Sequence, residues 1–397
     1  MTSMHLRYNY RLRVSAKAER MLQAEWSLAR WIWNECVAMS QSKHALKEEC
    51  GPAQLDKMLT AARGQNEWLR AGTSVVQQQT IRDFGKSRSK ALKDIKNLLP
   101  MRQRAGMPKF KSRKRSLPTL NYTHSAFRVK DGRLCLSKGI VIPVVWSREL
   151  PSAPKSVRVY QDSLGHWYAS FVVDVEQTLL PLTGAVIGID WGVKEIATTT
   201  SDEHDLPHPE YGRKAAVRLA RYQRQQARRA RRQGRRLAGV QSRGYKQATR
   251  MAAKLHKKVA RQRQDDSRKW AKSITQDFDI LAVEDFKPNF LAKSTMARKA
   301  ADAAIGAAKR ELITMAGKHG REVRLVNPAY TTMDCGSCGA RAKHKLLLSE
   351  RTYVCTNCGV VSPRDKNSAL VMLIRAGLNP ASADRIRLDE PQARYAA

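Results

Sequence analysis

Residues 186–192 read Val186-Ile187-Gly188-Ile189-Asp190-Trp191-Gly192, an apolar run with an acid near its end. A second apolar run ends in the same way and reads Ile280-Leu281-Ala282-Val283-Glu284-Asp285-Phe286. A third acid lies in Pro363-Arg364-Asp365-Lys366-Asn367-Ser368-Ala369, a segment that we expect to open a helix. Short apolar runs of this length are typical of buried strands. Two strands and a helix in this order can gather three carboxylates at one edge of a sheet, and the sequence predicts that arrangement.

Asp190, Glu284 and Asp365 are the residue types that a phosphodiester-cleaving metal site needs. Two-metal hydrolysis requires acidic oxygens that hold two Mg²⁺ ions about 3.5–4 Å apart, and Mg²⁺ prefers oxygen ligands. An acid at a strand end is also a common helix cap or loop anion, and Asp285 and Asp174 compete with Glu284 and Asp190 for the role. No serine–histidine–acid set or glycine-rich phosphate loop offers another chemistry. The prediction is a metal-dependent nuclease that uses two Mg²⁺ ions.

Four cysteines form two Cys-x2-Cys pairs, Cys335 with Cys338 and Cys355 with Cys358. The spacing between the pairs is typical of a tetrahedral zinc site. A glycine follows each pair, which lets backbone amides turn towards the sulfur atoms. Four thiolates leave no open position on the metal, so we expect one structural Zn²⁺ ion and no catalytic role for it. The chain has 7 cysteines in all, an odd number that argues against a disulfide framework.

The chain is strongly basic, with 73 Lys and Arg against 35 Asp and Glu among 397 residues and a net charge of +38. Such a charge attracts polyphosphate, because neutralised phosphates release their counterions. Residues 211–263 carry many Lys and Arg residues and no Asp or Glu. A solvated helix face is the plainer interpretation of such a run. Like charges without counter-charges repel one another, however, so nucleic acid is the expected partner.

The candidate nucleic-acid contacts are basic residues of this segment and of a basic connector over residues 100–115. They are Arg228, Arg229, Arg231, Arg232, Lys257 and Lys258 in the first, and Lys109 and Lys111 in the second. The sequence contains no run of 18 apolar residues and no secretory signal at its start, so we expect no membrane partner. The protein is expected to be intracellular and cytoplasmic.

Hydrophobic periodicity predicts an α+β chain of several domains. Residues 6–14 alternate as a strand does, and helix is expected in several stretches between Ala16 and Leu99, with a break at Gly51-Pro52. Residues 127–175 have the pattern of strands and a hairpin. The basic residues 211–263 are expected to form a helical hairpin.

The order of these motifs resembles the TnpB family of transposon-encoded, RNA-guided nucleases, which are similar to compact type V CRISPR effectors. The family carries a G-I-D-x-G strand, a V-E-D strand, a four-cysteine ribbon and an R-D-x-N helix, and this chain has all four in that order. The likeness covers nearly the whole chain. Residues 29–34 are similar to the family's early aromatic helix, residues 107–111 to its basic connector, and residues 255–258 to the helix before its second acid.

The resemblance implies an RNase H-like (RuvC) nuclease domain in which Asp190, Glu284 and Asp365 are the catalytic acids. It implies that the four cysteines hold zinc in a ribbon that binds the target nucleic acid. Two positions depart from the family pattern. Pro363 stands where the family usually carries an acid, and Ser368 where it usually carries alanine. Both departures bear on the fine geometry around Asp365, and neither removes a catalytic acid.

The resemblance also implies how the domains are arranged. The expected parts are a wedge β-barrel domain (1–14 and 118–180), a helical recognition domain (15–117), the RuvC-like domain (181–330) with the basic helical hairpin 211–263, the zinc ribbon (331–362), the helix of the third RuvC motif (363–378) and a disordered tail (379–397).

For function, the resemblance implies an RNA-guided DNA endonuclease encoded by an insertion sequence, which binds a guide RNA and cuts double-stranded DNA next to a short flanking motif. In such systems base pairing reads the target, and the protein reads the flanking motif and the shape of the heteroduplex. Gln77, Gln78 and Gln79 fall on the helix that approaches this motif in the family. Gln78 is the candidate contact, because glutamine can read adenine in the major groove. A polar helix face is an equally good interpretation.

Three alternatives stay open on the sequence alone. A compact type V CRISPR effector shares the motifs and differs in having a neighbouring repeat array. A nuclease-inactive, RNA-guided repressor is disfavoured because all three acids are present. A zinc-ribbon accessory protein without a guide would show no metal-dependent cleavage. We expect the protein in the bacterial cytoplasm, at the nucleoid when it is bound to DNA, as a monomer or a dimer.

Overall fold

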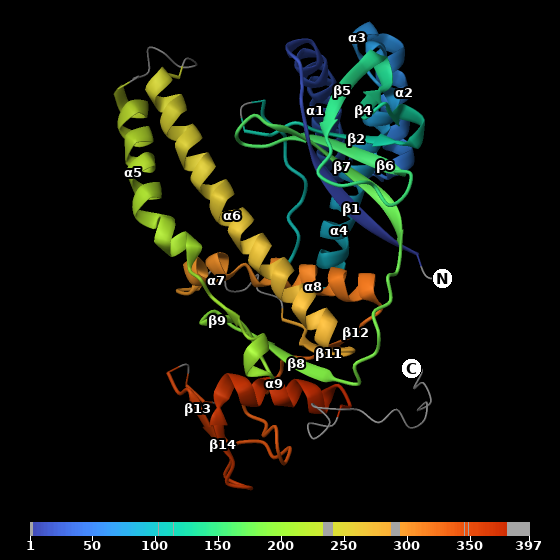
Figure 1. Ribbon diagram of the computed structural model, residues 1–397. Helices are drawn as coiled ribbons and strands as arrows, with labels where there is room; N and C mark the ends of the chain where they lie inside the picture. Colours follow the sequence, from blue (N-terminus) through green and yellow to red (C-terminus); the bar gives the residue numbers. More distant parts are fainter. Residues whose placement is uncertain are drawn as a thin grey trace. The chain divides into compact units, whose positions relative to one another are not determined.

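The computed structural model of the protein describes residues 3–101, 103–113, 115–232, 241–286, 294–344, 346–347 and 349–378 (Figure 1). The tail expected at residues 379–397 lies outside the described residues. The chain divides into two compact units, of which one is Ser3–Val175 and the other begins at Glu176. Both combine helices with sheets, as expected of an α+β chain of more than one domain. In the described ranges, no helix is long and apolar enough to cross a membrane.

The first unit is built around a seven-stranded sheet with the order β2-β6-β7-β1-β5-β4-β3. Its strands are β1 (Ser3–Leu12), β2 (Thr119–Thr123), β3 (Phe127–Lys130), β4 (Arg133–Leu136), β5 (Ile140–Val145), β6 (Ser156–Gln161) and β7 (Trp167–Glu176). The edge strands β2 and β3 are joined by a single 3₁₀ turn, His124–Ala126, so the sheet curves until its edges nearly meet. Apolar side chains such as Tyr10, Leu120 and Phe171 fill the inside of this curve.

Helices of the first unit pack on this sheet and on one another. They are α1 (Ala16–Ala45), α2 (Pro52–Gln65), α3 (Glu67–Ala71) and α4 (Ser74–Lys96). The side chain of Ser15 caps the start of α1 by accepting a hydrogen bond from the N–H of Ala18 at 3.2 Å. The first half of α1 contributes Trp26 to the core of the sheet, and the second half contributes Ile32 to a core shared with the other helices. One helix therefore belongs to two cores, and the sheet and the helices form one unit.

The second unit is built around a five-stranded sheet with the order β10-β9-β8-β11-β12. Its strands are β8 (Val186–Trp191), β9 (Glu195–Thr199), β10 (Leu206–Pro207), β11 (Ile280–Glu284) and β12 (Glu322–Val326). β8, β11 and β12 run parallel, with Ile189 opposite Val283, whereas β9 is antiparallel to β8. Parallel neighbours end at the same edge of a sheet, so the carboxyl ends of β8 and β11 lie side by side.

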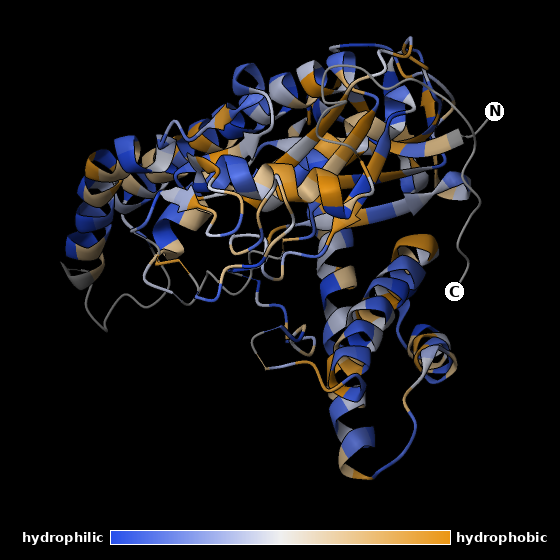
Figure 2. Cartoon of the chain, turned by 90° about the horizontal axis from the view of Figure 1, so that it is seen from below, coloured by the Kyte–Doolittle hydropathy of each residue, from blue (hydrophilic) through white to orange (hydrophobic). Residues whose placement is uncertain are grey.

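Helices cover both faces of this sheet (Figure 1). The helices are α6 (Arg243–Asp277), α7 (Ala297–Ala303), α8 (Ile305–His319) and α9 (Arg364–Arg375). Ile187 and Leu281 pack against α6 and α8 on one face, whereas Val186 and Ala282 pack against α9 on the other. Figure 2 shows apolar colouring concentrated along strands, while the helices alternate between polar and apolar residues. The central strands are buried on both sides, as is typical of a parallel sheet between helices.

α5 (Tyr211–Arg232) and α6 form the expected helical hairpin. α6 continues to Asp277, beyond residue 263 where the sequence predicted the hairpin to end, because its last turns pack on the sheet. Asp302 holds the base of the hairpin: its carboxylate accepts hydrogen bonds from the N–H of Gly212 (2.8 Å) and of Arg213 (2.9 Å), and it pairs with Arg263. Residues 233–240, between the two helices, lie outside the described residues.

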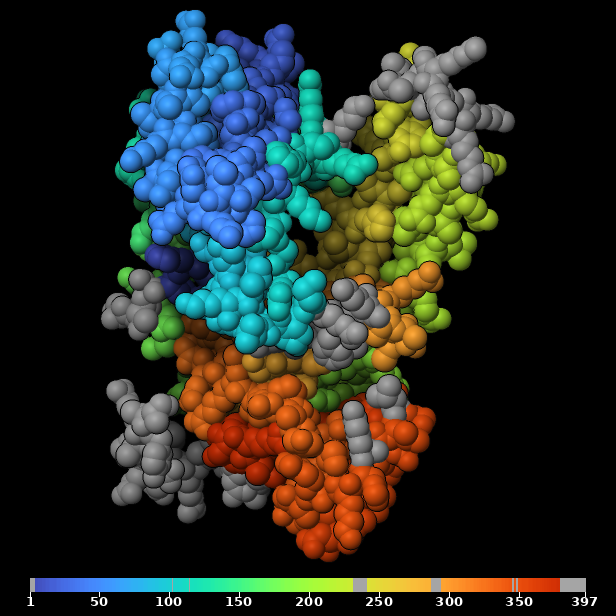
Figure 3. Space-filling model, turned by 180° about the vertical axis from the view of Figure 1, so that it is seen from behind, coloured from blue at the N-terminus to red at the C-terminus, as the bar shows by residue number. Residues whose placement is uncertain are grey.

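The cysteines lie in a small ribbon between β12 and α9. Its strands β13 (Thr352–Val354) and β14 (Val361–Pro363) are antiparallel, and β14 runs directly into α9. The core of the ribbon consists of little more than Tyr353 and two of the cysteines. In Figure 3 the ribbon residues, coloured orange to red, form a lobe at the surface. So small a core cannot fold the ribbon by hydrophobic burial alone.

Candidate active site and cysteine cluster

Strand alternation places two of the predicted acids on the face of the sheet that α9 covers. Asp190 and Glu284 have the same parity along their strands as Val186 and Ala282, which pack against α9. The register of β8 and β11 makes the two acids neighbours at the ends of adjacent parallel strands. The N–H of Trp191 donates a hydrogen bond to the carboxylate of Glu284 at 3.2 Å, and its indole N–H donates to the Glu284 carbonyl at 3.2 Å. Trp191 thus fixes the position of Glu284 relative to β8.

The third acid reaches this face because α9 lies directly on β8. A Cβ atom at Gly188 would overlap the carbonyl oxygen of Ala369, so the helix approaches as closely as it does only because that residue is glycine. Asp365 lies in the first turn of α9, with its side chain 34% exposed. The apolar positions Met372 and Leu373 of the same helix are fully buried. The packing of α9 therefore holds Asp365 beside the ends of β8 and β11.

The three carboxylates influence one another electrostatically. Burial raises the pKa of Asp190 well above its ordinary value, and the charges of Glu284 and Asp365 raise it further. Burial also raises the pKa of Glu284 to about 7, against the opposing effects of the Trp191 N–H and of Lys309. Neighbouring carboxylates in a poorly solvated site cannot all stay ionised without a counter-charge. This cluster consequently favours a bound cation.

Two arginines supply part of that counter-charge in this structure. Arg364 Nε lies 3.3 Å from Asp365 Oδ1, and Arg351 Nη1 lies 3.8 Å from Asp365 Oδ2. In the described part of the chain the three carboxylates do not form a group whose ligand atoms all lie within 4.8 Å of one another. The three acids are therefore not as tightly clustered as the four cysteines are.

The structure separates the acids that the sequence left as competitors. Asp285 has the opposite parity to Glu284, and its carboxylate accepts a hydrogen bond from Lys309 of α8 at 2.7 Å. It lies on the face of the sheet away from α9. Asp174 lies on β7 in the first unit and pairs with Lys155 at 2.5 Å. Glu284 and Asp190 are the acids that share a face with the start of α9.

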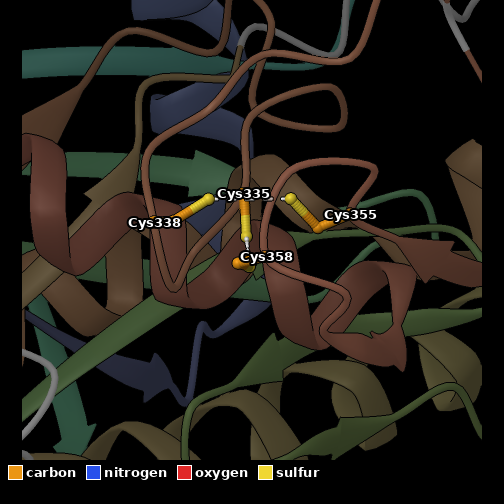
Figure 4. Close-up of side chains that lie close together, drawn as sticks. All are labelled: Cys335, Cys338, Cys355 and Cys358. Atoms are coloured by element: carbon orange, nitrogen blue, oxygen red, sulfur yellow. Dashed lines mark hydrogen bonds between the residues drawn. The ribbon is translucent and has the colours of Figure 1, made fainter.

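The four cysteines converge on one point, as the sequence predicted. Figure 4 shows their sulfur atoms pointing towards a common centre. All four lie within 4.8 Å of one another, with Cys335 Sγ 3.8 Å from Cys358 Sγ and Cys338 Sγ 3.6 Å from Cys355 Sγ. A tetrahedral site with Zn–S bonds of about 2.3 Å places its sulfurs about 3.8 Å apart. The donor set and its dimensions fit a metal such as zinc.

Backbone N–H groups donate hydrogen bonds to the cysteine sulfurs and favour their thiolate form. Gly339 and Gly359 have φ of +73° and +72°, which turns the chain after each Cys pair back towards the sulfurs. The N–H groups of Cys358 and Asn357 donate to the Cys355 sulfur and lower its pKa to about 6. The Val360 N–H lowers the pKa of Cys358, but proton sharing with Cys338 and Cys355 outweighs it and raises that pKa to about 12. Zinc would replace the shared protons, because it binds thiolates.

The hairpin presents arginines on one exposed face of α5. The exposed arginines recur every three or four residues, which places them on one side of a helix, and they are Arg218, Arg221, Arg224 and Arg228. Lys258 on α6 is exposed, whereas Lys257 is partly buried. Arg229 donates a hydrogen bond to the Gly244 carbonyl and so joins the two helices. The predicted contacts Arg231 and Arg232 have side chains outside the described part.

The basic connector is bound to α1. The indole N–H of Trp33 donates to the carbonyl of Lys109 at 2.9 Å, and the side chain of Asn34 bonds to the backbone N–H (2.7 Å) and carbonyl (3.2 Å) of Lys111. The Lys109 side chain is exposed. Lys111 Nζ lies 3.5 Å from the centre of the Trp33 ring, and burial lowers its pKa to about 8. Its ammonium group thus makes a cation–π contact within the first unit, which the sequence did not predict.

The three glutamines of α4 differ in their surroundings. Gln77 is fully buried, donates to the Leu69 carbonyl at 2.8 Å and accepts from Arg63 at 2.5 Å. It is a structural residue of the helix core. Gln78 is exposed, so it is available for a partner.

Sequence reasoning missed several residues that complete the site. Arg364 and Asn367 belong to the third motif with Asp365, so the motif indicated that they lie near the site. Nothing in the motif showed which groups they contact. Lys309 carries no such signal, because a single lysine in an amphipathic helix is indistinguishable from the other basic residues of this chain. The close approach at Gly188 depends on α9, which is far away in the sequence.

The chain is similar to known proteins in sequence and in fold. Residues 170–295 match the family model described as "Probable transposase", and residues 306–372 match the model "Cas12f1-like, TNB domain". A "Putative RNA-guided DNA endonuclease" of Streptomyces pristinaespiralis is 31% identical over 72% of this chain and 69% of its own length. A "Putative RNA-guided DNA endonuclease InsQ" of Escherichia coli (strain K12) is 25% identical over 97% of this chain and 95% of its own. The solved Cas12f1–sgRNA–target DNA complex aligns with a TM-score of 0.53 at 14% identity, covering 96% of this chain and 99% of that chain.

These findings identify the fold first. A multidomain α+β chain with a nearly closed sheet, a sheet covered by helices on both faces and a four-cysteine ribbon is a protein with a Cas12f-like fold. The sequence identity with the Streptomyces relative, over more than two thirds of both chains, also identifies the family. The chain belongs to the TnpB family.

Proposed function

We propose that this protein is an RNA-guided DNA endonuclease of an insertion sequence, which cuts double-stranded DNA next to a short flanking motif. The observation that carries the proposal is that Asp190 and Glu284 lie on one face of the sheet, at the ends of two parallel strands, and that Asp365 lies at the start of the helix that covers this face. The relatives named as RNA-guided DNA endonucleases support the same activity.

The three acids are proposed to hold two Mg²⁺ ions, which fit an oxygen donor set whose charges repel one another. When bound, Mg²⁺ supplies an activated water and neutralises the charge that develops on the scissile phosphate. Asp190 and Glu284 hold their carboxylates at fixed strand ends, and Trp191 orients Glu284 by its N–H. Arg364 is buried between the acids and the ribbon, where it offsets the negative charge of the site. This part of the second unit is the proposed RuvC-like nuclease domain.

The remaining parts are proposed to bind nucleic acid. The ribbon is proposed to hold one structural Zn²⁺ ion through Cys335, Cys338, Cys355 and Cys358 and to contact the target. The curved sheet and the helices of the first unit are proposed to serve as the wedge and recognition domains, with Gln78 near the flanking motif. The exposed arginines of α5 and the exposed Lys258 are proposed to hold the phosphate backbones of guide RNA and heteroduplex. Their exposure and single sign support that role.

Replacing Arg221, Arg224 and Arg228 by glutamine is expected to weaken binding of guide RNA and target irrespective of their sequence. For every phosphate that the variant no longer neutralises, the dependence of log K on log salt should become shallower by about 0.7 to 0.9. Gel-shift titrations over a range of salt concentrations measure both quantities. Lys47, Lys57 and Arg70, which are exposed in the first unit, provide a control variant with the same change in net charge. Equal losses of affinity in the two variants would attribute binding to overall charge and contradict the hairpin assignment.

Mg²⁺ is expected to raise the melting temperature more at about pH 8 than at about pH 5.5. Burial raises the pKa of Glu284 from 4.5 to about 7, so the folded protein favours the protonated side chain. That contribution to stability is present below about pH 4.5 and is lost as the pH rises through about 7. Mg²⁺ binds the carboxylate and not the acid, so it counteracts the loss at high pH.

Thermal unfolding with and without Mg²⁺ across this pH range is the measurement. Glu284→Gln cannot ionise at this position, and the pH dependence of the Mg²⁺ effect should be much smaller in this variant. A Mg²⁺ effect that is equal at both pH values in the wild type would contradict the assignment of Glu284 as a ligand.

The proposed function as a whole is tested by sequencing the RNA that copurifies with the protein. A single discrete RNA species with a variable 3′ end is the expected result. A DNA duplex matching that variable end should then be cut in Mg²⁺ when it carries the right flanking sequence. Guided binding without any cutting would favour an RNA-guided repressor. The absence of a discrete RNA, and of cutting in a library of flanking sequences, would overturn the proposal.

A further inference from the structure

α9 lies between the sheet that carries Asp190 and the turn of the ribbon at Cys335–Cys338, which we call the knuckle. On the sheet side, the close approach at Gly188 fixes the distance between helix and strand. On the opposite side the helix carries Asn367, which is 1% exposed. Asp365 lies two residues before Asn367, in the first turn of the same helix. The position of the third acid is therefore determined from two sides, and only the sheet side belongs to the nuclease core.

Asn367 is bonded through both ends of its side-chain amide to the backbone around Cys335. Its Oδ1 accepts a hydrogen bond from the N–H of Gly336 at 2.8 Å, and its Nδ2 donates one to the carbonyl of Asp334 at 2.7 Å. These two residues flank Cys335 directly. Losing either bond would leave a buried polar group without a partner, which is costly. The amide thus holds the helix to one particular conformation of the first knuckle.

Packing and further bonds reinforce this connection. A Cβ atom at Gly336 would lie 2.6 Å from the Cβ of Leu370, so the knuckle backbone touches α9. Other bonds between the ribbon and the two ends of α9 run from the Arg364 N–H to the Arg351 carbonyl (2.8 Å) and from Arg375 to the Asp334 carboxylate (2.6 Å). The knuckle is therefore bonded to α9 at both ends of the helix and packed against its middle.

We propose that Asn367 is a positioning residue that couples the four-cysteine knuckle to Asp365, so that the folded knuckle sets the geometry of the nuclease site. The inference rests on the proposed function, because it assumes that Asp365 binds metal. Asn367 does not touch the reacting atoms and acts through the carboxylate two residues away. Groups that orient a metal ligand typically change metal affinity or activity by about 10- to 100-fold when removed. The ribbon would then be a structural part of the nuclease site as well as a surface for nucleic acid.

Asn367→Ala is expected to bind metal at the acids about tenfold more weakly. Mn²⁺, a paramagnetic substitute for Mg²⁺, can be counted by electron paramagnetic resonance in the complex with copurified RNA. The signal of each protein is corrected by that of the same protein carrying Asp190→Ala, so that ions bound to RNA cancel. Binding of the guided target should stay near the wild-type level, and cleavage should be restored at high Mn²⁺. A general loss of stability would not be restored by the metal in this way.

Gly336→Ala is the second variant. Its methyl group would press on Leu370 Cβ and on the Asn367 carbonyl oxygen, and so displace the knuckle from α9 without changing the Asn367 side chain or any of the four cysteines. It should weaken Mn²⁺ binding in the same direction, and it keeps the proposal testable if Asn367→Ala fails to fold. Asn327→Ala is the matched control. It removes the same side chain from the loop before the ribbon, where Asn327 is exposed and accepts a hydrogen bond from the Ala329 N–H at 2.9 Å. Its Mn²⁺ titration should match that of the wild type.

The Mn²⁺ titration decides between the outcomes. Weaker binding in Asn367→Ala and Gly336→Ala, with Asn327→Ala unchanged, supports the coupling whether or not zinc content also falls. Wild-type Mn²⁺ binding in both variants overturns the inference and leaves the proposed function intact. A wild-type protein that neither binds Mn²⁺ at the acids nor cuts a guided target overturns the proposed function, and the inference fails with it.

Discussion

Asp190→Ala is expected to abolish cleavage of a guided target while leaving guide and target binding near the wild-type level. Asp190 ends a central strand, where its carboxylate shares one face of the sheet with Glu284 and the start of α9. Removing it takes away a ligand of the proposed metal ions and the charge stabilisation that they supply. We expect the rate of cleavage to fall by at least about 10²- to 10³-fold. The exposed arginines of the hairpin are untouched, so binding should survive.

The measurement is cleavage of a matched duplex in Mg²⁺, run beside gel shifts on the same preparations. Glu284→Gln and Asp365→Asn should fail to cut in the same way, because all three acids belong to one site. Asp285→Asn is the matched control. The Asp285 carboxylate lies on the other face of the sheet with Lys309, so this variant should still cut. Robust cutting by the Asp190 variant, or equal loss of cutting in the Asp285 variant, would contradict the assignment.

The parts of the site that the sequence predicted are those that depend on local pattern. An apolar run ending in an acid identifies a buried strand and the place where it ends, and two such runs in order predict neighbouring strand ends. Cysteine spacing is more specific still, because a Cys-x2-Cys turn brings two sulfurs together without help from the rest of the fold. The structure accordingly brings the four cysteines to one point.

The parts that the sequence did not predict depend on contacts between distant segments. Glu284 and Asp285 are adjacent, and only the position of α9 on one face of the sheet tells which of them joins Asp190. Nothing in the sequence distinguishes Gly188 from the other glycines among the 22, because its role depends on the contact with Ala369. The role of Lys111 could not be predicted from composition either. Its positive charge suggested a contact with nucleic acid, whereas the structure places its ammonium group against the Trp33 ring.

Cys335→Ser is expected to release zinc and to unfold the ribbon before any other part of the protein. The ribbon has almost no apolar core besides Tyr353, so its folding energy must come from the metal. Structural zinc contributes about 10–16 kcal/mol of apparent binding free energy in zinc-finger peptides. The unit Ser3–Val175 has a core of its own and should keep its thermal transition. Elemental analysis should find one zinc per wild-type chain and much less in the variant.

Hydrogen exchange shows which segments unfold when zinc is lost. Residues 331–362 should exchange faster in Cys335→Ser, and so should the first turn of α9, because Asn367 is bonded to both neighbours of Cys335. Cys135→Ser makes the same chemical change in β4 of the first unit and should leave zinc content unchanged. Equal zinc in wild type and Cys335→Ser would refute the ribbon assignment. Release of zinc with an unchanged α9 would instead show that the helix is held by the sheet alone, since Gly188 and Ala369 would then suffice to keep Asp365 in place.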